Sequence, residues 1–307
     1  MKTIILGAGA VGGYFGGRLA QAGYPVTFLV REKRFNQLKE NGLVVHSFKG
    51  DFSVEPDIEK MPEAIENPKV VVVALKNYHL ESAIPSIKQL VGKGAKVLPL
   101  LNGVQHLNAL IEEVGKENVL GGSCYIESTL NDKGEIVHTS PMQDIIFGSL
   151  TGEDDPAFLQ EIELMMAQAG IQVILSDHIL QDMWSKYLFL AILSGITSST
   201  RQPIGISLND PVTRHFLLDL VTEVCEVAKS RISLPDDIVY QLVKRIEGIK
   251  PSMTSSMHRD LEKGLPIEID SIHGALLQMG EEANLVTPSI RAVYALLHPY
   301  KNGRPIK

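Results

Sequence analysis

The segment TIILGAGAVGG, residues 3–13, decides the fold of the first half of this chain. Its apolar, β-branched start is typical of a buried strand, and the glycines that follow open a helix expected over residues 10–22. The G-x-G-x-x-G motif between them predicts a dinucleotide-binding turn, with a helix N-terminus that offers N–H groups to phosphates. A glycine-rich turn without a ligand is the alternative. The expected cofactor-binding residues are Gly7, Ala8, Gly9, Ala10, Val11 and Gly12.

Strand and helix patterns alternate through the first 176 residues. This alternation, with strands buried on both faces, is typical of a doubly wound parallel sheet. A hairpin is expected over 43–55, and the β patterns of 119–149 are expected to extend the same sheet in mixed fashion. The remaining expected strands are 25–30, 69–75, 95–101 and 171–176, and the remaining expected helices are 33–40, 78–91, 104–114 and 156–169.

From residue 177 onward the patterns are helical only. The fold class is therefore α/β, with a Rossmann-type cofactor domain over 1–176 followed by an all-helical domain over 177–307. The helices are expected at 178–195, 210–231, 235–248, 252–263, 268–283 and 287–298.

Composition and charge restrict the class of protein. The 307 residues carry a formal charge of −7 without a Lys/Arg block, which predicts no nucleic-acid binding. No apolar run reaches the roughly 18–20 residues of a membrane span, and the N-terminus lacks a signal pattern. Two cysteines outside any CxxC pattern suit a reducing compartment, and we expect a cytoplasmic protein. The scattered histidines predict no metal site.

The end of the second strand bears on the choice of cofactor. It continues as FLVREKR, residues 28–34, with Arg31 where NAD-binding sheets carry an acid for the ribose hydroxyls. Arg31, with Lys33 or Arg34 behind it, could bind a 2′-phosphate, which favours NADPH. A solvated surface charge is the alternative for Arg31, and Glu32 is interpreted as an acid in the first turn of a helix.

Two further loops follow expected strands at the carboxyl edge of the sheet, where ligands bind in such folds. Lys76 follows the strand at 69–75, and Asn102 follows the strand at 95–101. Each could contact a ligand or be an ordinary loop residue.

The helix MWSKYLFLAILSG, residues 183–195, contains one charged side chain, Lys186. Either its ammonium reaches water along an apolar stem, or it is kept in a dry place because it takes part in chemistry. The residues of this helix leave both explanations open.

The order and spacing of these motifs resemble the ketopantoate reductases, from residue 1 to about 298. The resemblance is carried by Asn102-Gly103-Val104, Trp184-x-Lys186 and Ser256-Met257 followed by Glu268-Ile269-Asp270, in addition to the glycine motif. It implies NADPH-dependent reduction of a 2-keto acid to a 2-hydroxy acid, with 2-dehydropantoate of pantothenate and coenzyme A synthesis as the foremost substrate. It also implies a helical domain like that of 6-phosphogluconate dehydrogenase and an active site between the domains.

The resemblance implies roles for single residues. Lys186 and Glu268 fall on catalytic positions, Asn102 and Ser256 on substrate-binding positions, and Lys76 near the adenosine phosphate; Asn102 is also expected near the cofactor. Elementary chemistry agrees, because hydride addition to a ketone leaves an alkoxide that a cation can stabilise and protonate. Without the resemblance, Glu268 could be a helix-start acid and Ser256 an ordinary helix serine.

One departure concerns the substrate. Where family members usually carry asparagines, one and two turns after the lysine, this chain has Leu190 and Ser194. Ser194 is still expected to contact the substrate, but the identity of the keto acid is left open.

Other functions compete with this interpretation. A related reductase or dehydrogenase of hydroxy acids, including the opine type, would share the architecture. A non-catalytic NADP-binding sensor would need neither Lys186 nor Glu268. The long amphipathic helices after residue 210 could bury a partner helix in a homodimer.

Overall fold

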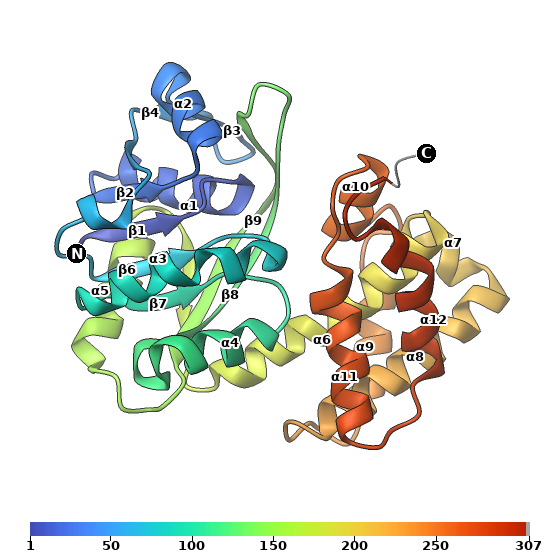
Figure 1. Ribbon diagram of the computed structural model, residues 1–307. Coiled ribbons are helices and arrows are strands. Elements are labelled where there is room, and N and C mark those ends of the chain that lie inside the picture. Colours follow the sequence, from blue (N-terminus) through green and yellow to red (C-terminus); the bar gives the residue numbers. More distant parts are fainter. Residues whose placement is uncertain (305–307) are drawn as a thin grey trace. The chain divides into compact units, whose positions relative to one another are not determined.

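The computed structural model of the chain describes residues 1–304 (Figure 1). The chain forms two compact units, one of Met1–Met183 and one from Trp184 onward. The last strand, β10 (Gln172–Leu175), precedes helix α6 (Ile179–Thr200), and the boundary between the units falls inside α6. The domain division expected at residue 176 stays a prediction.

The first unit is built on a parallel five-stranded sheet. Its order is β5 (Asp57–Glu59), β2 (Val26–Leu29), β1 (Thr3–Leu6), β6 (Val70–Val73) and β7 (Lys96–Pro99). All residues of β1, β2 and β6 are buried, as their apolar runs predict. The chain starts in the centre, moves outward to β5 and then crosses to the other side of β1. This confirms the doubly wound sheet and puts its switch point between β1 and β6.

The first unit contains five α-helices, which begin and end close to the residues expected from the sequence. Helix α1 approaches the strands closely because its inner face is glycine. A Cβ built on Gly16 would lie 2.6 Å from the ring of Phe28 and 2.7 Å from Ile5. The helices are α1 (Ala10–Gln21), α2 (Glu32–Asn41), α3 (Leu80–Gly92), α4 (Gln105–Val114) and α5 (Pro156–Gln168).

Residues 119–149 touch the first sheet through one isolated bridge, in which Val119 pairs in parallel with Val97 of β7, but the expectation that their strands extend this sheet is wrong. They form a long antiparallel hairpin, β8 (Leu120–Leu130) and β9 (Ile136–Ser149), in a second sheet of order β10-β9-β3-β4. The expected hairpin β3 (Leu43–Ser47) and β4 (Phe52–Val54) joins this sheet through a parallel β3–β9 pair. Buried and accessible residues alternate along much of β9, which suits a strand with one covered face rather than a central strand of the first sheet.

The second unit is helical throughout its described residues. Helix α6 is buried on most sides, with Leu188, Ala191 and Ile192 completely inaccessible. The helix expected at 268–283 consists of a π-helical segment, η4 (Asp270–Gly274), followed by α11, and neither η4 nor α7 was expected. The other helices are α7 (Ile204–Asn209), α8 (Pro211–Lys229), α9 (Ile238–Glu247), α10 (Ser256–Glu262), α11 (Ala275–Glu282), α12 (Pro288–Leu297) and the short η5 (His298–Tyr300).

A buried carboxylate explains the start of α12. The two oxygens of Glu223 on α8 accept hydrogen bonds from the N–H groups of Ser289 and Ile290, at 2.9 and 3.0 Å. These donors lie in the first turn of a helix and have no partner within it. Glu223 therefore joins α8 to α12 in the core of the unit.

Candidate active site

The loop between β1 and α1 has the geometry of a phosphate-binding turn. Gly7 adopts φ +98°, which L side chains rarely tolerate. A Cβ on Gly12 would lie 2.0 Å from the carbonyl oxygen of Gly7, so glycine is required for the helix to start this close to the strand. A Cβ on Gly9 would meet no atom within 4 Å, and no side chain caps α1. The loop thus has open space above its backbone and N–H groups directed into it, which fits the pyrophosphate of a nicotinamide dinucleotide.

The register of the sheet brings the predicted loops to one edge. Leu6 pairs with both Leu29 and Val73, and Val73 pairs with Pro99, so these four strand ends are level. Lys76 and Asn102 each follow a strand end by three residues and are half-buried. The two loops are joined directly, because the side-chain amide of Asn77 donates to the carbonyl of Asn102 at 2.9 Å. Lys76 and Asn102 therefore lie on the side of the sheet where the glycine loop begins.

Arg31 caps the N-terminus of α2 and is exposed. Its guanidinium donates to the hydroxyl of Ser82 at 2.8 Å and lies 3.5 Å from Nδ1 of His79. Burial and the Arg31 charge lower the pKa of His79. The neighbouring carboxylate of Glu32, whose negative charge would oppose a phosphate nearby, is paired with the ammonium of Lys60 at 2.7 Å.

Arg34 makes structural contacts that the sequence did not indicate. Its Nε donates to the carbonyl of Ala8 in the glycine loop at 2.9 Å, and its Nη1 donates to the carbonyl of Gly134 at 2.8 Å. Arg34 is half-buried, and burial lowers its pKa. It joins α2, the glycine loop and the β8–β9 turn. This role depends on a residue 100 positions away in the chain, and no local pattern points to it.

Lys186 lies on the accessible side of α6. It is half-buried, next to exposed Ser185, and one turn before half-buried Leu190. The flanking aromatic residues Trp184 and Tyr187 are 4% and 1% exposed. Lys186 is therefore a half-buried cation on a helix whose neighbouring aromatic residues are buried.

Glu268 directly precedes the helical segment that begins at Ile269. It is 5% exposed, between fully buried Ile269 and nearly buried Ile267. Its carbonyl accepts from the N–H of Ile272 at 3.1 Å and from the hydroxyl of Ser271 at 3.2 Å. A buried carboxylate at a helix start is favoured by the helix dipole, so this position alone does not distinguish a catalytic acid from a helix-start acid.

The two predicted serines differ in accessibility. Ser256 is the first residue of α10 and is half-buried; the N-cap is its neighbour Ser255, whose hydroxyl accepts from the N–H of His258 at 3.0 Å. Ser194 is completely buried, and its hydroxyl donates to the carbonyl of Ala191 at 3.4 Å. Contact of either serine with a substrate stays a prediction.

Sequence comparisons decide the family. The model of the family "Ketopantoate reductase PanE/ApbA" matches residues 3–152, and the model of its C-terminal part matches residues 178–301. The chain belongs to the ketopantoate reductase family. This confirms the resemblance, the fold class and an oxidoreductase activity for the chain, in a family that depends on NAD(P).

Members of this family and one structural neighbour show the range of similarity. The uncharacterized oxidoreductase YkpB of Bacillus subtilis is 39% identical, over 98% of this chain and 99% of its own. The 2-dehydropantoate 2-reductase of a Nostoc species is 30% identical, over 99% and 96%. A structure of D-mandelate dehydrogenase with NADH and anilino(oxo)acetate has a TM-score of 0.86 over 98% of both chains at 23% identity, which indicates a shared fold.

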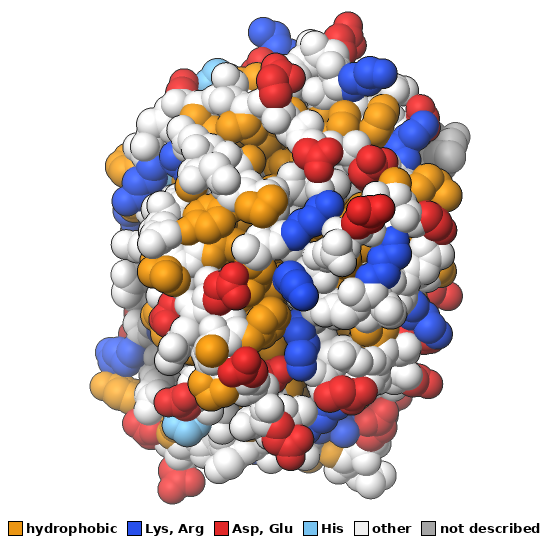
Figure 2. All heavy atoms as spheres, turned by 90° about the vertical axis from the view of Figure 1, so that its left-hand side faces the viewer, with side chains coloured by type: hydrophobic (Ala, Val, Ile, Leu, Met, Phe, Trp, Pro, Cys, Tyr) orange, Lys and Arg blue, Asp and Glu red, His pale blue; other side chains and the backbone are white. Residues whose placement is uncertain are grey.

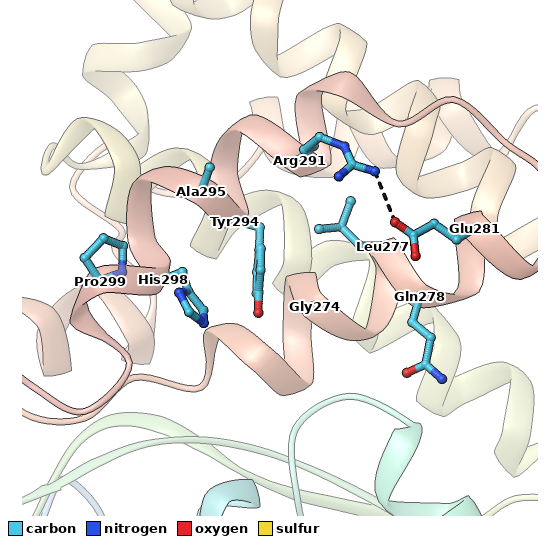
Figure 3. A pocket seen from close by; sticks show the side chains of 9 residues that line it. All are labelled: Gly274, Leu277, Gln278, Glu281, Arg291, Tyr294, Ala295, His298 and Pro299. Atoms are coloured by element: carbon cyan, nitrogen blue, oxygen red, sulfur yellow. Dashed lines mark hydrogen bonds and ion pairs between the residues drawn. The ribbon is translucent and has the colours of Figure 1, made fainter.

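A groove of about 500 Å³ lies between α11 and α12 (Figure 3). Arg291 and Glu281 form an ion pair at one end, with 3.1 Å between nitrogen and oxygen, and the rings of Tyr294 and His298 lie 5.0 Å apart at the other. None of the predicted site residues lines this groove. The groove is therefore distinct from the predicted positions of Lys186, Ser256 and Glu268.

Other classes of site are not supported by the described residues. Residues 1–304 contain no group of three or more His, Cys, Asp and Glu side chains that could hold a metal ion. None of the helices in that range has the length and apolar character to cross a bilayer. On the face shown in Figure 2, acidic and basic side chains are interspersed with hydrophobic ones, so this face carries no field of a single sign.

Proposed function

We propose that this protein reduces a 2-keto acid to a 2-hydroxy acid with NADPH, and that 2-dehydropantoate is its first candidate substrate. The observation that carries the proposal is the combination of an open glycine loop at the sheet's switch point with a half-buried Lys186 and a buried Glu268, the two residues that the resemblance to the family assigns to catalysis. Relatives named 2-dehydropantoate 2-reductase, which match nearly the whole chain, support the choice of substrate.

Each unit contributes its own part of the chemistry. When bound, NADPH supplies the hydride that adds to the keto carbon. The N-terminus of α1 holds the pyrophosphate, Arg31 binds the 2′-phosphate, and Lys76 and Asn102 line the same edge of the sheet. Lys186 donates a proton from Nζ to the oxygen that becomes the hydroxyl, and Glu268 balances the ammonium charge. Asn102 and Ser256 hold the substrate by hydrogen bonds.

A second candidate substrate class has an observation of its own. Leu190 is half-buried one turn after Lys186, so it offers an apolar surface rather than an amide. Such a surface favours 2-keto acids with apolar side chains, and the shared fold with D-mandelate dehydrogenase agrees with this class.

The decisive experiment mixes the protein with NADPH and a panel of 2-keto acids and follows the loss of absorbance at 340 nm. The panel contains ketopantoate, 2-ketoisovalerate and phenylglyoxylate, and NADH replaces NADPH in a parallel series. Reduction of ketopantoate with NADPH supports the first candidate, and reduction of the apolar acids alone supports the second. No reduction of any of them contradicts the proposal.

Location and assembly stay predictions. Cys124 and Cys225 are both buried and form no disulfide within the described residues. A homodimer through the helical unit is testable by light scattering.

A further inference from the structure

The π-helical segment η4 begins two residues after Glu268. The N–H of Ala275 donates to the carbonyl of Asp270, five residues earlier, which is the spacing of a π turn. Such turns are rare and frequently mark functional sites. The contacts of η4 show what this irregular segment does in the helical unit.

Two buried hydrogen bonds join η4 to α6. The hydroxyl of Tyr187 donates to the carbonyl of Ile272 at 2.6 Å, and Nε2 of His273 lies 3.0 Å from the carbonyl of Ala191. Tyr187 and Ala191 are four residues apart, so both bonds leave from one side of α6. We call these two hydrogen bonds the α6–η4 tie. Its first bond starts at the residue next to Lys186.

The groups of the tie stay uncharged at neutral pH. Both side chains are buried, Tyr187 at 1% exposure and His273 at 0%. Burial raises the pKa of the Tyr187 phenol and lowers the pKa of His273 to about 4. Neutral His273 must carry its proton on Nε2, because that nitrogen faces a carbonyl. Gly195 makes room for it, since a Cβ there would lie 2.8 Å from Nε2.

The remaining residues of η4 are also engaged. Asp270 accepts from the hydroxyl of Tyr294 at 2.8 Å, and a Cβ on Gly274 would lie 3.1 Å from the same ring (Figure 3). Ser271 donates to the carbonyl of Glu268. All five residues of η4 thus contact α6, α12 or Glu268 itself.

We propose that η4 is a positioning element for Glu268, and that Tyr187 and His273 keep the backbone after Glu268 in register with the turn of α6 that carries Lys186. This inference rests on the proposed function, because Lys186 and Glu268 are the groups being positioned. Tyr187 and His273 act through these two and are positioning residues. Catalytic groups must be held within about 0.5 Å of their productive geometry, and a displacement of about 1 Å can cost about a hundredfold in rate.

The first test replaces Tyr187 by Phe, which removes the hydroxyl and keeps the ring. We expect kcat to fall about tenfold, the KM for NADPH to stay unchanged, and amide hydrogen exchange over residues 268–275 to speed up about tenfold. The control is Thr200→Val. It removes a hydroxyl on the same helix that donates to the carbonyl of Ile196 at 2.8 Å, and it should leave exchange and kcat at wild-type values.

The second test replaces His273 by a residue that can form the same hydrogen bond and by one that cannot. In His273→Gln the amide nitrogen can still donate to the carbonyl of Ala191, whereas in His273→Leu it cannot. We expect Gln to keep most of kcat and Leu to lose about tenfold. Equal loss in both variants would overturn the role of the Nε2 hydrogen bond.

The exchange measurement separates this proposal from the proposed function, because it is made without substrate. If the native protein reduces no 2-keto acid, the proposed function fails. The exchange measurement still tests the α6–η4 tie. Wild-type exchange rates in Tyr187→Phe would show that the tie does not hold residues 268–275 in place, and faster exchange would support it. If the protein is active, faster exchange together with unchanged kcat overturns the positioning role.

Discussion

Arg31 stands at the N-terminus of α2, where its guanidinium contacts Ser82 and His79. A 2′-phosphate would replace these neutral contacts by charge-assisted hydrogen bonds. We expect Arg31→Ala to weaken NADPH binding by about 1–3 kcal/mol, roughly 5- to 150-fold in Kd, and to leave NADH binding nearly unchanged. Isothermal titration with both cofactors measures this. The control is Lys39→Ala, which removes an exposed cation in the last turn of the same helix. Equal affinity of the native protein for both cofactors would contradict the assignment.

Lys186 has a role that its exposure alone does not decide, because a half-buried lysine could simply reach water. If it is the proton donor, Lys186→Ala should lower kcat by roughly 10²–10⁴, the range for a general acid. Cofactor binding should persist, since all the proposed phosphate contacts belong to the first unit. Steady-state kinetics and cofactor titration test both statements, with exposed Ser185→Ala as the neighbouring control. Normal turnover of the alanine variant would show that the lysine is only a surface group.

The glycine loop offers a matched pair of substitutions at the scale of a structural element. Gly12→Ala would place a Cβ 2.0 Å from the carbonyl oxygen of Gly7 and should destabilise the start of α1. Gly9→Ala meets nothing within 4 Å and keeps an extended backbone at φ −76°, so it should fold normally. Its methyl group would occupy the space for the pyrophosphate, so NADPH affinity should fall at least about tenfold. Thermal unfolding and cofactor titration distinguish the two effects, and normal affinity of Gly9→Ala would contradict a nucleotide site here.

The α6–η4 tie also predicts a dependence of stability on pH. His273 has a pKa of about 4 in the folded protein and an ordinary value of 6.5 when unfolded. Burial of the neutral ring therefore contributes fully to the free energy of unfolding above pH 6.5. As the pH falls from about 6.5 to 4, the free energy of unfolding decreases by ~3 kcal/mol from this residue. Urea unfolding at several pH values should show a smaller decrease for His273→Gln than for wild type. Parallel curves would mean that His273 is not buried as a neutral base.

The elements that the sequence predicts are those whose patterns are local in the chain. The strands β1, β2 and β6 and the loop of Gly7 to Gly12 were predictable, because buried runs and glycine spacing are local features. The second sheet was not, since the pairing of β3 with β9 joins residues about 90 positions apart. The strand β5 contains one apolar residue, Ile58, and gives little signal.

The candidate site shows the same contrast between local motifs, which were predictable, and long-range contacts, which were not. Lys33 or Arg34 was expected to support Arg31 at a phosphate, and the hydrogen bonds of Arg34 to Ala8 and Gly134, which depend on the tertiary structure, were not predictable. The π turn at Asp270–Gly274 leaves no mark in the helical periodicity of the chain, so Tyr187 and His273 looked like ordinary core residues. The residues that position a site are thus harder to predict from sequence than those that the family's motifs contain.

At the scale of the whole molecule, the residues proposed to bind the cofactor and those proposed for acid–base chemistry belong to different units. The glycine loop, Arg31, Lys76 and Asn102 belong to the first unit, and Lys186 and Glu268 to the second. Substrate preference can therefore change in the helical unit while the cofactor site is kept. Leu190 and Ser194, at positions where family members usually carry asparagines, are differences of this kind.

These differences predict a weaker preference for ketopantoate than in relatives that carry both asparagines. A site that binds a hydroxyl through buried polar groups rejects analogues without it by about 10⁴–10⁵, whereas an apolar site discriminates weakly. Leu190 offers no hydrogen bond, and the hydroxyl of completely buried Ser194 already donates to Ala191. The kcat/KM ratio of ketopantoate to 2-ketoisovalerate should therefore stay well below about 10⁴, and Leu190→Asn should raise it. A native ratio above about 10⁴ would show that other residues, with Asn102 and Ser256 the first to test, recognise the hydroxyl.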